Sequence, residues 1–192
     1  MLRLEDLLDI MNEAAMKRLN ESGIGADFDD AERTDIARKV GIAALKFADL
    51  QNQRLTNYVF DPERFTAFEG KTGPYLLYAV VRIKSILRKA EGQDAKAGVI
   101  NAIEPAEQQL VLALDAFGRA VATSAEKYSP HILCDHIYKV AQAFSRFYTD
   151  CPILVDDTPK DVRASRLALA GLTLRQLESG LNILGIEAPE RM

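Results

Sequence analysis

Apolar residues recur at spacings of three and four along most of the chain, and polar residues fill the positions between them. This period is typical of amphipathic α-helices and predicts an all-α fold. The predicted helices cover residues 4–19, 30–50, a short stretch from 62, 74–90, 105–126, 131–149 and 160–184. Residues 55–60 have strand-like side chains but no partner strand of similar length nearby. They are predicted to connect an N-terminal helical pair or trio to a helical bundle.

Three of these helices are predicted to start where a polar residue is followed by proline, because the N–H that proline lacks has no intrahelical partner there. The three pairs are Asp61-Pro62, Ser129-Pro130 and Thr158-Pro159. Asp161 follows Thr158 three residues later, which is the spacing of a capping box. The acidic cluster Asp27, Asp29, Asp30 and Glu32 is predicted to cap the second helix, and Gly185 to end the last one.

The composition excludes several classes of protein. A chain of 192 residues with 48% apolar content is not mainly disordered, and 7% aromatic residues without tryptophan favour helices over a barrel or sandwich. Two cysteines are too few for a disulfide framework and indicate a reducing compartment. No apolar run approaches the roughly 18 to 20 residues of a membrane span, and the acidic start is unlike a signal peptide. A cytoplasmic protein with no membrane partner is predicted.

The formal net charge of −4 alone argues against binding to nucleic acid, but the charge is unevenly distributed. Residues 71–90 contain no acid and five bases, namely Lys71, Arg82, Lys84, Arg88 and Lys89. A phosphate backbone responds to local positive potential more than to a distant net charge. This basic island is therefore a candidate surface for nucleic acid.

One side of the helix predicted over residues 74–90 combines aromatic and basic side chains. At about 100° per residue, five positions fall within an arc of about 60° while apolar residues cluster on another face. The five are Lys71, Tyr75, Tyr78, Arg82 and Lys89. Rings interleaved with cations suit an unpaired RNA loop, whose bases stack on the rings while Arg or Lys engages phosphate. The residues alone leave a second interpretation open, in which the tyrosines edge the core and the charges form a solvated face.

Residues Phe68–Ala79, followed by Arg82, resemble the signature that opens the DALR anticodon-binding domain of arginyl-tRNA synthetases. Three further blocks resemble the same family in the same order along the chain. Residues 41–50 are similar to the helix that joins this domain to the catalytic domain, 144–154 to the end of its central helix, and 166–192 to its last helix and chain end. The four blocks cover nearly the whole chain, which makes the resemblance specific.

The resemblance implies two parts: residues 1–66, a helical connecting segment that follows the catalytic domain, and residues 67–192, a DALR helical bundle of the class I synthetase type. The two ATP-binding signatures of the family do not occur in the sequence. The chain is therefore expected to be the C-terminal portion of an arginine–tRNA ligase, with no catalytic residue and no cofactor of its own. ATP and Mg are expected for the full-length enzyme, and the implied partner is the anticodon stem-loop of tRNA(Arg), bound by a monomer.

The resemblance also implies roles for individual residues. Tyr75, Tyr78 and Arg82 would face the anticodon loop, and Tyr148 and the terminal Met192 with its carboxylate would lie near it. They would hold splayed bases by stacking and test the middle anticodon base, a cytosine in the common arginine codon sets. The predicted tRNA-binding residues are Tyr75, Tyr78, Arg82, Tyr148, Met192, Lys71 and Lys89.

At two positions the sequence departs from the family pattern. Lys71 stands where many members have a small polar residue such as Asn, and it is expected to add a phosphate contact. Leu77 stands where many have Gln, which would exchange a hydrogen bond for packing.

Other constellations support different functions less well. His131, Cys134, His136 and Cys151 are metal-ligating types, but their spacing is poor for one site, so neither a metal nor a metal-dependent enzyme is predicted. Arg163 and Arg166 share a stripe of the last helix, where they could touch the tRNA backbone or, as we favour, form a solvated face. The alternative function is a free-standing helical protein-interaction module that is related to the synthetase and does not bind tRNA.

Overall fold

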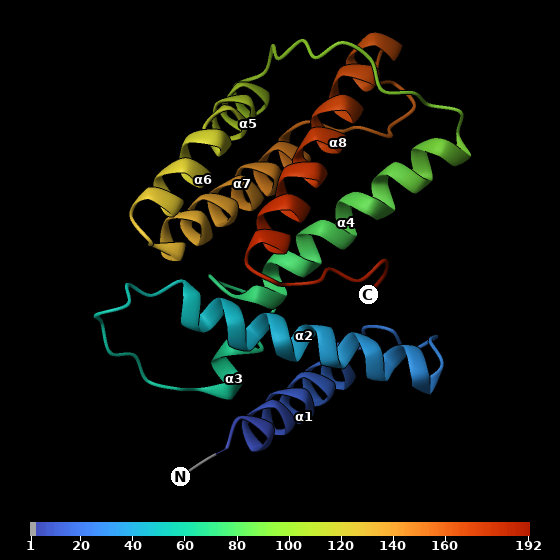
Figure 1. Ribbon diagram of the computed structural model, residues 1–192. Coiled ribbons are helices and arrows are strands. Elements are labelled where there is room, and N and C mark those ends of the chain that lie inside the picture. Colours follow the sequence, from blue (N-terminus) through green and yellow to red (C-terminus); the bar gives the residue numbers. More distant parts are fainter. Residues whose placement is uncertain (1–2) are drawn as a thin grey trace.

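The computed structural model describes residues 3–192, which contain eight helices and no strand (Figure 1). The predicted all-α fold is confirmed. The helices are α1 (Leu4–Ser22), α2 (Asp30–Leu50), α3 (Pro62–Phe65), α4 (Gly73–Gly92), α5 (Pro105–Asp115), α6 (Phe117–Glu126), α7 (Pro130–Asp150) and α8 (Lys160–Ile183). None of these helices is long and apolar enough to cross a membrane.

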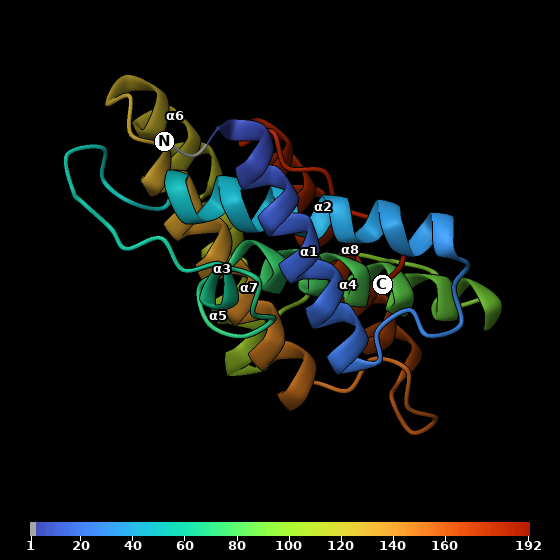
Figure 2. The ribbon, with the colours of Figure 1, turned by 90° about the horizontal axis from the view of Figure 1, so that it is seen from below.

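The helices form two groups that share a core. In Figure 1, α1 and α2 cross each other below a bundle of α4 to α8, and Figure 2 shows α1 lying across α2. Within the bundle, α7 packs on α5, α6 and α8, and α4 packs on α7 and α8. A continuous cluster of buried apolar side chains runs from Phe47 of α2 to Phe144 and Phe147 of α7. The connector 55–60 lacks helix, as predicted, and exposes Leu55 and Val59.

The helix predicted over residues 105–126 is in fact two helices, which meet at Ala116. The Nε2 of Gln176 on α8 donates to the carbonyl oxygen of Leu114 over 3.0 Å. This hydrogen bond ties the last turn of α5 to α8 beside the break. The local periodicity of residues 105–126 does not show the break.

Two of the three predicted helix starts are confirmed. Pro62 and Pro130 are the first residues of α3 and α7, and the Asp61 carboxylate accepts from the N–H of Arg64 over 3.1 Å. The third is wrong by one residue, because Pro159 has extended backbone (ψ 144°) and α8 begins at Lys160. Thr158 therefore lies too far from the helix to cap it, and the predicted capping box does not form.

The predicted ends and faces of other helices mostly agree with the structure. Asp29 caps α2 by accepting from the N–H of Glu32 over 2.8 Å, as expected of the acidic cluster. Gly185 follows α8 with a φ of 69°, a left-handed conformation that suits glycine. The apolar spacing of α1 predicts an inner side that includes Leu4 and Met11. Met11 packs against α2 and α3, but Leu4 is exposed because it lies two turns before that contact.

A buried ion pair joins α5 to α8. The Nε of Arg166 donates to Glu107 over 2.7 Å, and the side chains are 11% and 3% exposed. Arg166 also donates to the carbonyl oxygen of Pro152, while the second oxygen of Glu107 accepts from the N–H groups of Ile103 and Glu104. The pair thus fixes the loops before α5 and after α7 as well as the two helices.

Arg163 and Arg166 both bind other parts of the chain, which the solvated-face interpretation did not include. Arg166 is buried in the ion pair with Glu107, so it neither faces solvent nor is available to RNA. Arg163 donates to the carbonyl oxygens of Val155 and Thr158 and so closes the loop before α8. These two arginines of α8 therefore have structural roles. The helical period alone shows only that they share one side of the helix.

Candidate nucleic-acid interface

The start of α4 fixes which of its side chains point outward. The hydroxyl of Thr72 accepts from the N–H of Tyr75 over 3.2 Å and donates to the carbonyl oxygen of Ala67 over 2.6 Å, which caps the helix. From this start, Leu76, Val80 and Ile83 fall on the side that faces the core and are fully buried. The tyrosines and Arg82 are then left on an outer side, as the helical period predicted.

Helix α7 lies beside that outer side of α4. The guanidinium carbon of Arg82 is 4.4 Å from the centre of the Tyr148 ring, and the ring centres of Tyr75 and Tyr138 are 5.5 Å apart. Both contacts join the two helices. With an ion pair at the start of α4, they define what we call the α4–α7 face, made of Lys71, Tyr75, Tyr78, Arg82, Asp135, Tyr138 and Tyr148.

The side chains of the α4–α7 face differ in how far they are exposed. Tyr78 is 43% exposed, while Tyr75, Arg82 and Tyr148 are partly buried. A cation over an aromatic ring is worth about 0.5–1 kcal/mol at such a site, so Arg82 and Tyr148 hold each other in place. Tyr78 is therefore the ring most open to a stacked base, beside a fixed Arg–Tyr pair.

The five bases of the basic island do not share one face, which corrects the expectation of a single basic surface. The Nζ of Lys84 lies 3.0 Å from Glu178 and 2.6 Å from Glu190, and Arg88 donates to the carbonyl oxygen of Glu190. Burial lowers the pKa of Lys84, but hydrogen bonds to the two glutamates more than offset this and raise it. Lys84 and Arg88 thus bind the C-terminal tail on another side of α4, and Lys89 is exposed.

The predicted roles of Lys71 and Leu77 have different outcomes. Lys71 forms an ion pair with Asp135 of α7, so its ammonium group already has an anionic partner. Leu77 is fully buried, as expected if packing replaces the hydrogen bond of the residue common in the family.

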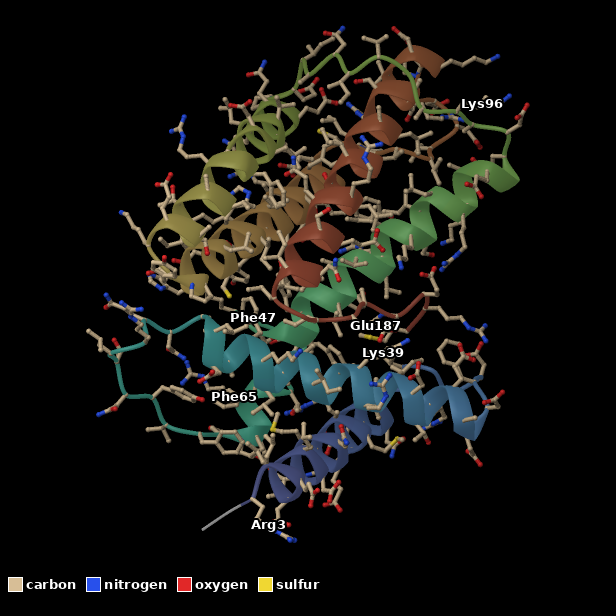
Figure 3. The ribbon with its side chains drawn as sticks, in the orientation of Figure 1. Arg3, Lys39, Phe47, Phe65, Lys96 and Glu187 are labelled. Atoms are coloured by element: carbon tan, nitrogen blue, oxygen red, sulfur yellow. The ribbon has the colours of Figure 1, made fainter. Side chains whose placement is uncertain are left out.

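The C-terminal tail, which ends in Met192, is held against α2 and α4. The tail runs along α2, where Lys46 donates to the carbonyl oxygen of Gly185, Lys39 lies 2.8 Å from Glu187 (Figure 3), and Arg191 lies 2.6 Å from both oxygens of Glu32. Met192 is partly buried against the main core. The tail is held by charges from α2 and α4, which the sequence does not place together.

The metal-ligating residue types are dispersed and their thiols are inert. The described part of the chain contains no group of three or more His, Cys, Asp or Glu side chains that could hold a metal ion. Cys134 is fully buried, and burial raises its pKa to about 12. Burial also raises the pKa of Cys151 and lowers that of His136. Both thiols therefore stay protonated at neutral pH and do not form a nucleophilic site.

Sequence reasoning missed three residues of α7 that border the face. Asp135, Tyr138 and Gln142 follow one another at spacings of three and four. Asp135 pairs with Lys71, Tyr138 contacts Tyr75, and Gln142 donates to the hydroxyl of Tyr138. The spacing itself was visible as one stripe of the predicted helix 131–149. That this stripe lies beside α4 depends on how the two helices pack, which their periodicity does not encode.

Comparison with known families gives two matches. Residues 76–192 match the family described as the DALR anticodon binding domain, and residues 1–62 match the catalytic domain of class I (R) tRNA synthetases. The chain is 56% identical to an arginine–tRNA ligase of Hyphomonas neptunium over 191 residues and 55% identical to one of Maricaulis maris over 190 residues. These alignments cover 100% and 99% of the chain but 32% of each relative. The chain thus spans about a third of the length of these curated relatives.

Solved structures show the same arrangement of helices. Thermus thermophilus arginyl-tRNA synthetase superimposes with a TM-score of 0.87 at 31% identity, over 98% of this chain and 32% of that one. Plasmodium falciparum arginyl-tRNA synthetase, at 23% identity, supports the fold alone, with a TM-score of 0.86 over 100% of this chain and 34% of that one. The resemblance to arginyl-tRNA synthetases seen in the sequence is confirmed. Because the DALR match covers more than half of its residues, the chain belongs to the DALR anticodon-binding domain family.

Proposed function

We propose that the chain binds the anticodon loop of tRNA(Arg) as the C-terminal part of an arginine–tRNA ligase. The observation that carries the proposal is the α4–α7 face, where the exposed ring of Tyr78 lies one turn of α4 from the Arg82–Tyr148 pair. Single-stranded loops are recognised by rings that stack on splayed bases and by cations that meet phosphate. The family match and the names of the relatives agree with this chemistry.

In this proposal the residues of the face have distinct roles. Tyr78 stacks on an unpaired base, and the Arg82 guanidinium, held over Tyr148, offers its N–H groups to a phosphate or a base edge. Lys89, exposed further along α4, adds positive potential along the backbone of the RNA. The middle anticodon cytosine is read by hydrogen bonds at its edge. Met192, at the end of the tail and partly buried against the main core, is proposed to lie near the loop.

The relatives are about three times as long as this chain. We propose that a protein of that length, with this chain as its C-terminal part, ligates arginine to tRNA(Arg) with ATP and Mg. The acids, histidines and cysteines of residues 3–192 do not gather into a set that fits a metal ion, so ATP and Mg are assigned to the rest of that protein. We place the boundary between the connecting segment and the DALR domain at residues 66 and 67, between α3 and α4. We also propose that the chain is a cytoplasmic monomer and that it has no ligase activity without the rest of the enzyme. The comparisons give no support to a protein-interaction module.

Binding of tRNA(Arg) should weaken when the face is truncated. Tyr78→Ala and Arg82→Ala should each lower affinity roughly 5- to 150-fold, since base–aromatic stacking contributes about 1–3 kcal/mol per base. Filter binding or fluorescence anisotropy measures the effect, at two salt concentrations because phosphate contacts weaken as salt rises. The matched controls are Tyr128→Ala and Arg119→Ala, which change exposed residues of the α6–α7 turn and α6. Unchanged affinity in both Tyr78→Ala and Arg82→Ala would show that the assigned face is wrong.

Releasing Lys71 from its ion pair should strengthen RNA binding. Asp135→Asn keeps the shape of the side chain but removes the charge that competes with phosphate for the Lys71 ammonium group. Because a partly exposed pair is worth about 0.2–1 kcal/mol, we expect the affinity for tRNA(Arg) to rise by about two- to fivefold at low salt. Asp115→Asn, at the exposed end of α5, is the control. A weaker complex with Asp135→Asn would mean that Lys71 does not meet phosphate.

A further inference from the structure

Tyr138 of α7 meets Tyr75 of α4 nearly edge to face. The ring centres are 5.5 Å apart and the ring planes are inclined by 62°. Both residues are partly exposed, and both border the core cluster with their inner edges. We call this pair of rings the corner; a flat ligand can stack on the part of either ring that remains exposed.

The hydroxyl of Tyr138 is oriented by a neighbour on its own helix. The Nε2 of Gln142, one turn further along α7, donates to this hydroxyl oxygen over 3.2 Å. A phenol that accepts a hydrogen bond in this way still has its own O–H to donate. Burial raises the pKa of Tyr75, and Tyr138 nearby raises it further, so the neighbouring phenol stays protonated at neutral pH. The corner therefore offers ring surface and hydroxyl donors but no charge.

We call the line along which α4 and α7 lie side by side the seam. The corner lies on this seam between two contacts that involve charged residues. Toward the start of α4 is the Lys71–Asp135 ion pair, and toward its end is the Arg82–Tyr148 pair. A loop that follows the seam with its phosphates near the cations would carry its bases past the corner. The ligand that fits is a flat, neutral ring with hydrogen-bond acceptors, in a chain that carries an anionic group before and after that ring.

We propose that Tyr138 is a further RNA-contacting residue, which with Tyr75 holds a second unpaired nucleobase of the loop whose other base stacks on Tyr78. Gln142 is a positioning residue that fixes the Tyr138 hydroxyl. This inference rests on the proposed function and extends it from α4 to α7. It assigns one base to the Tyr75–Tyr138 corner and another to Tyr78, so that rings from two helices read the loop.

The test uses anticodon stem-loops of tRNA(Arg) that carry 2-aminopurine at one loop position each, because stacking on an aromatic ring quenches its fluorescence. Tyr138→Ala should lower affinity roughly 5- to 150-fold, the range that alanine substitution gives for a stacked base. It should also abolish quenching at one loop position and leave the position that depends on Tyr78 quenched. Tyr138→Phe should keep that quenching and lose about fivefold in affinity, as expected for one hydrogen bond. Gln142→Ala should resemble Tyr138→Phe.

The outcomes separate this inference from the proposed function. If the unaltered chain binds and Tyr78→Ala weakens binding, but Tyr138→Ala and Tyr138→Phe leave affinity and quenching unchanged, the inference is overturned and the proposed function stands. Equal loss of quenching at every position in Tyr138→Ala, with no effect of Tyr138→Phe, would assign Tyr138 a structural role and also overturn it. If the unaltered chain does not bind the stem-loop, both fail. Thermal unfolding of each variant, with Tyr128→Ala as the matched control, shows whether the fold is kept.

Discussion

Replacing Glu107 with alanine should lower the free energy of unfolding by about 3–5 kcal/mol, the range for breaking a buried ion pair by removing one partner. The variant leaves the guanidinium of Arg166, only 11% exposed, without its carboxylate. It also leaves the N–H groups of Ile103 and Glu104 without their acceptor. Urea denaturation followed by circular dichroism measures the loss as a shift of the midpoint.

The control for this substitution is Glu13→Ala, which removes an exposed glutamate of α1 and should change stability by less than about 0.5 kcal/mol. A loss in Glu107→Ala no larger than in the control would show that the ion pair does not stabilise the joint between α5 and α8.

The same carboxylate should make the fold sensitive to acid. Burial raises the pKa of Glu107, but the hydrogen bonds from Arg166 and from the N–H groups of Glu104 and Ile103 outweigh it and lower the pKa below its usual 4.5. A group whose pKa is lowered by folding stabilises the protein fully above its unfolded pKa and loses this effect as pH falls through the folded value. Melting temperature should therefore fall more steeply below pH 4.5 in the unaltered chain than in Glu107→Gln. Parallel curves for the two proteins would contradict this assignment.

Gly73→Ala should destabilise the chain by about 3 kcal/mol or more, at the upper end of what overpacking costs. A methyl group at this first residue of α4 would overlap the carbonyl group of Ala43 and lie 3.1 Å from the nitrogen of Ala44. Because these are backbone atoms of α2, relief requires a shift of one helix against the other. The substitution therefore tests the contact that joins the α1–α2 pair to the bundle.

The matched control is Gly171→Ala, inside α8, where a methyl group would meet nothing within 4 Å. There alanine should leave stability unchanged or raise it by up to about 1 kcal/mol, since glycine is a weak helix former. Thermal melts of the two variants give the comparison. Similar melting temperatures would show that α2 and α4 are not closely packed at Gly73.

The sequence predicted most helices because each buries one apolar stripe, and the period of that stripe is local. The bounds of α2, at Asp30 and Leu50, agree with the prediction to the residue. The break at Ala116 escaped prediction because the apolar spacing of residues 105–126 does not mark it. The range of residues 160–184 gave the start of α8 correctly, but the predicted cap by Thr158 was wrong because Pro159 is still extended.

The sequence predicted only those residues of the candidate site that lie on α4. Tyr75, Tyr78 and Arg82 share an outer side of α4 because the helical period places them there. The partners of these side chains come from α7 and from the C-terminal tail, and the helical period of α4 does not predict them. Two examples are the ion pair of Lys71 with Asp135 and the ion pair of Lys84 with Glu190.

The central claim is that the α4–α7 face reads the anticodon loop. The most direct test is the affinity of the unaltered chain for two anticodon stem-loops of tRNA(Arg), one unchanged and one with its middle cytosine replaced by another base. We expect the unchanged stem-loop to bind at least about tenfold more tightly, which corresponds to about 1.4 kcal/mol. We also expect the Tyr78→Ala, Arg82→Ala double variant to lose that preference. Equal affinity of the unaltered chain for both stem-loops, or an undiminished preference in the double variant, would contradict the claim.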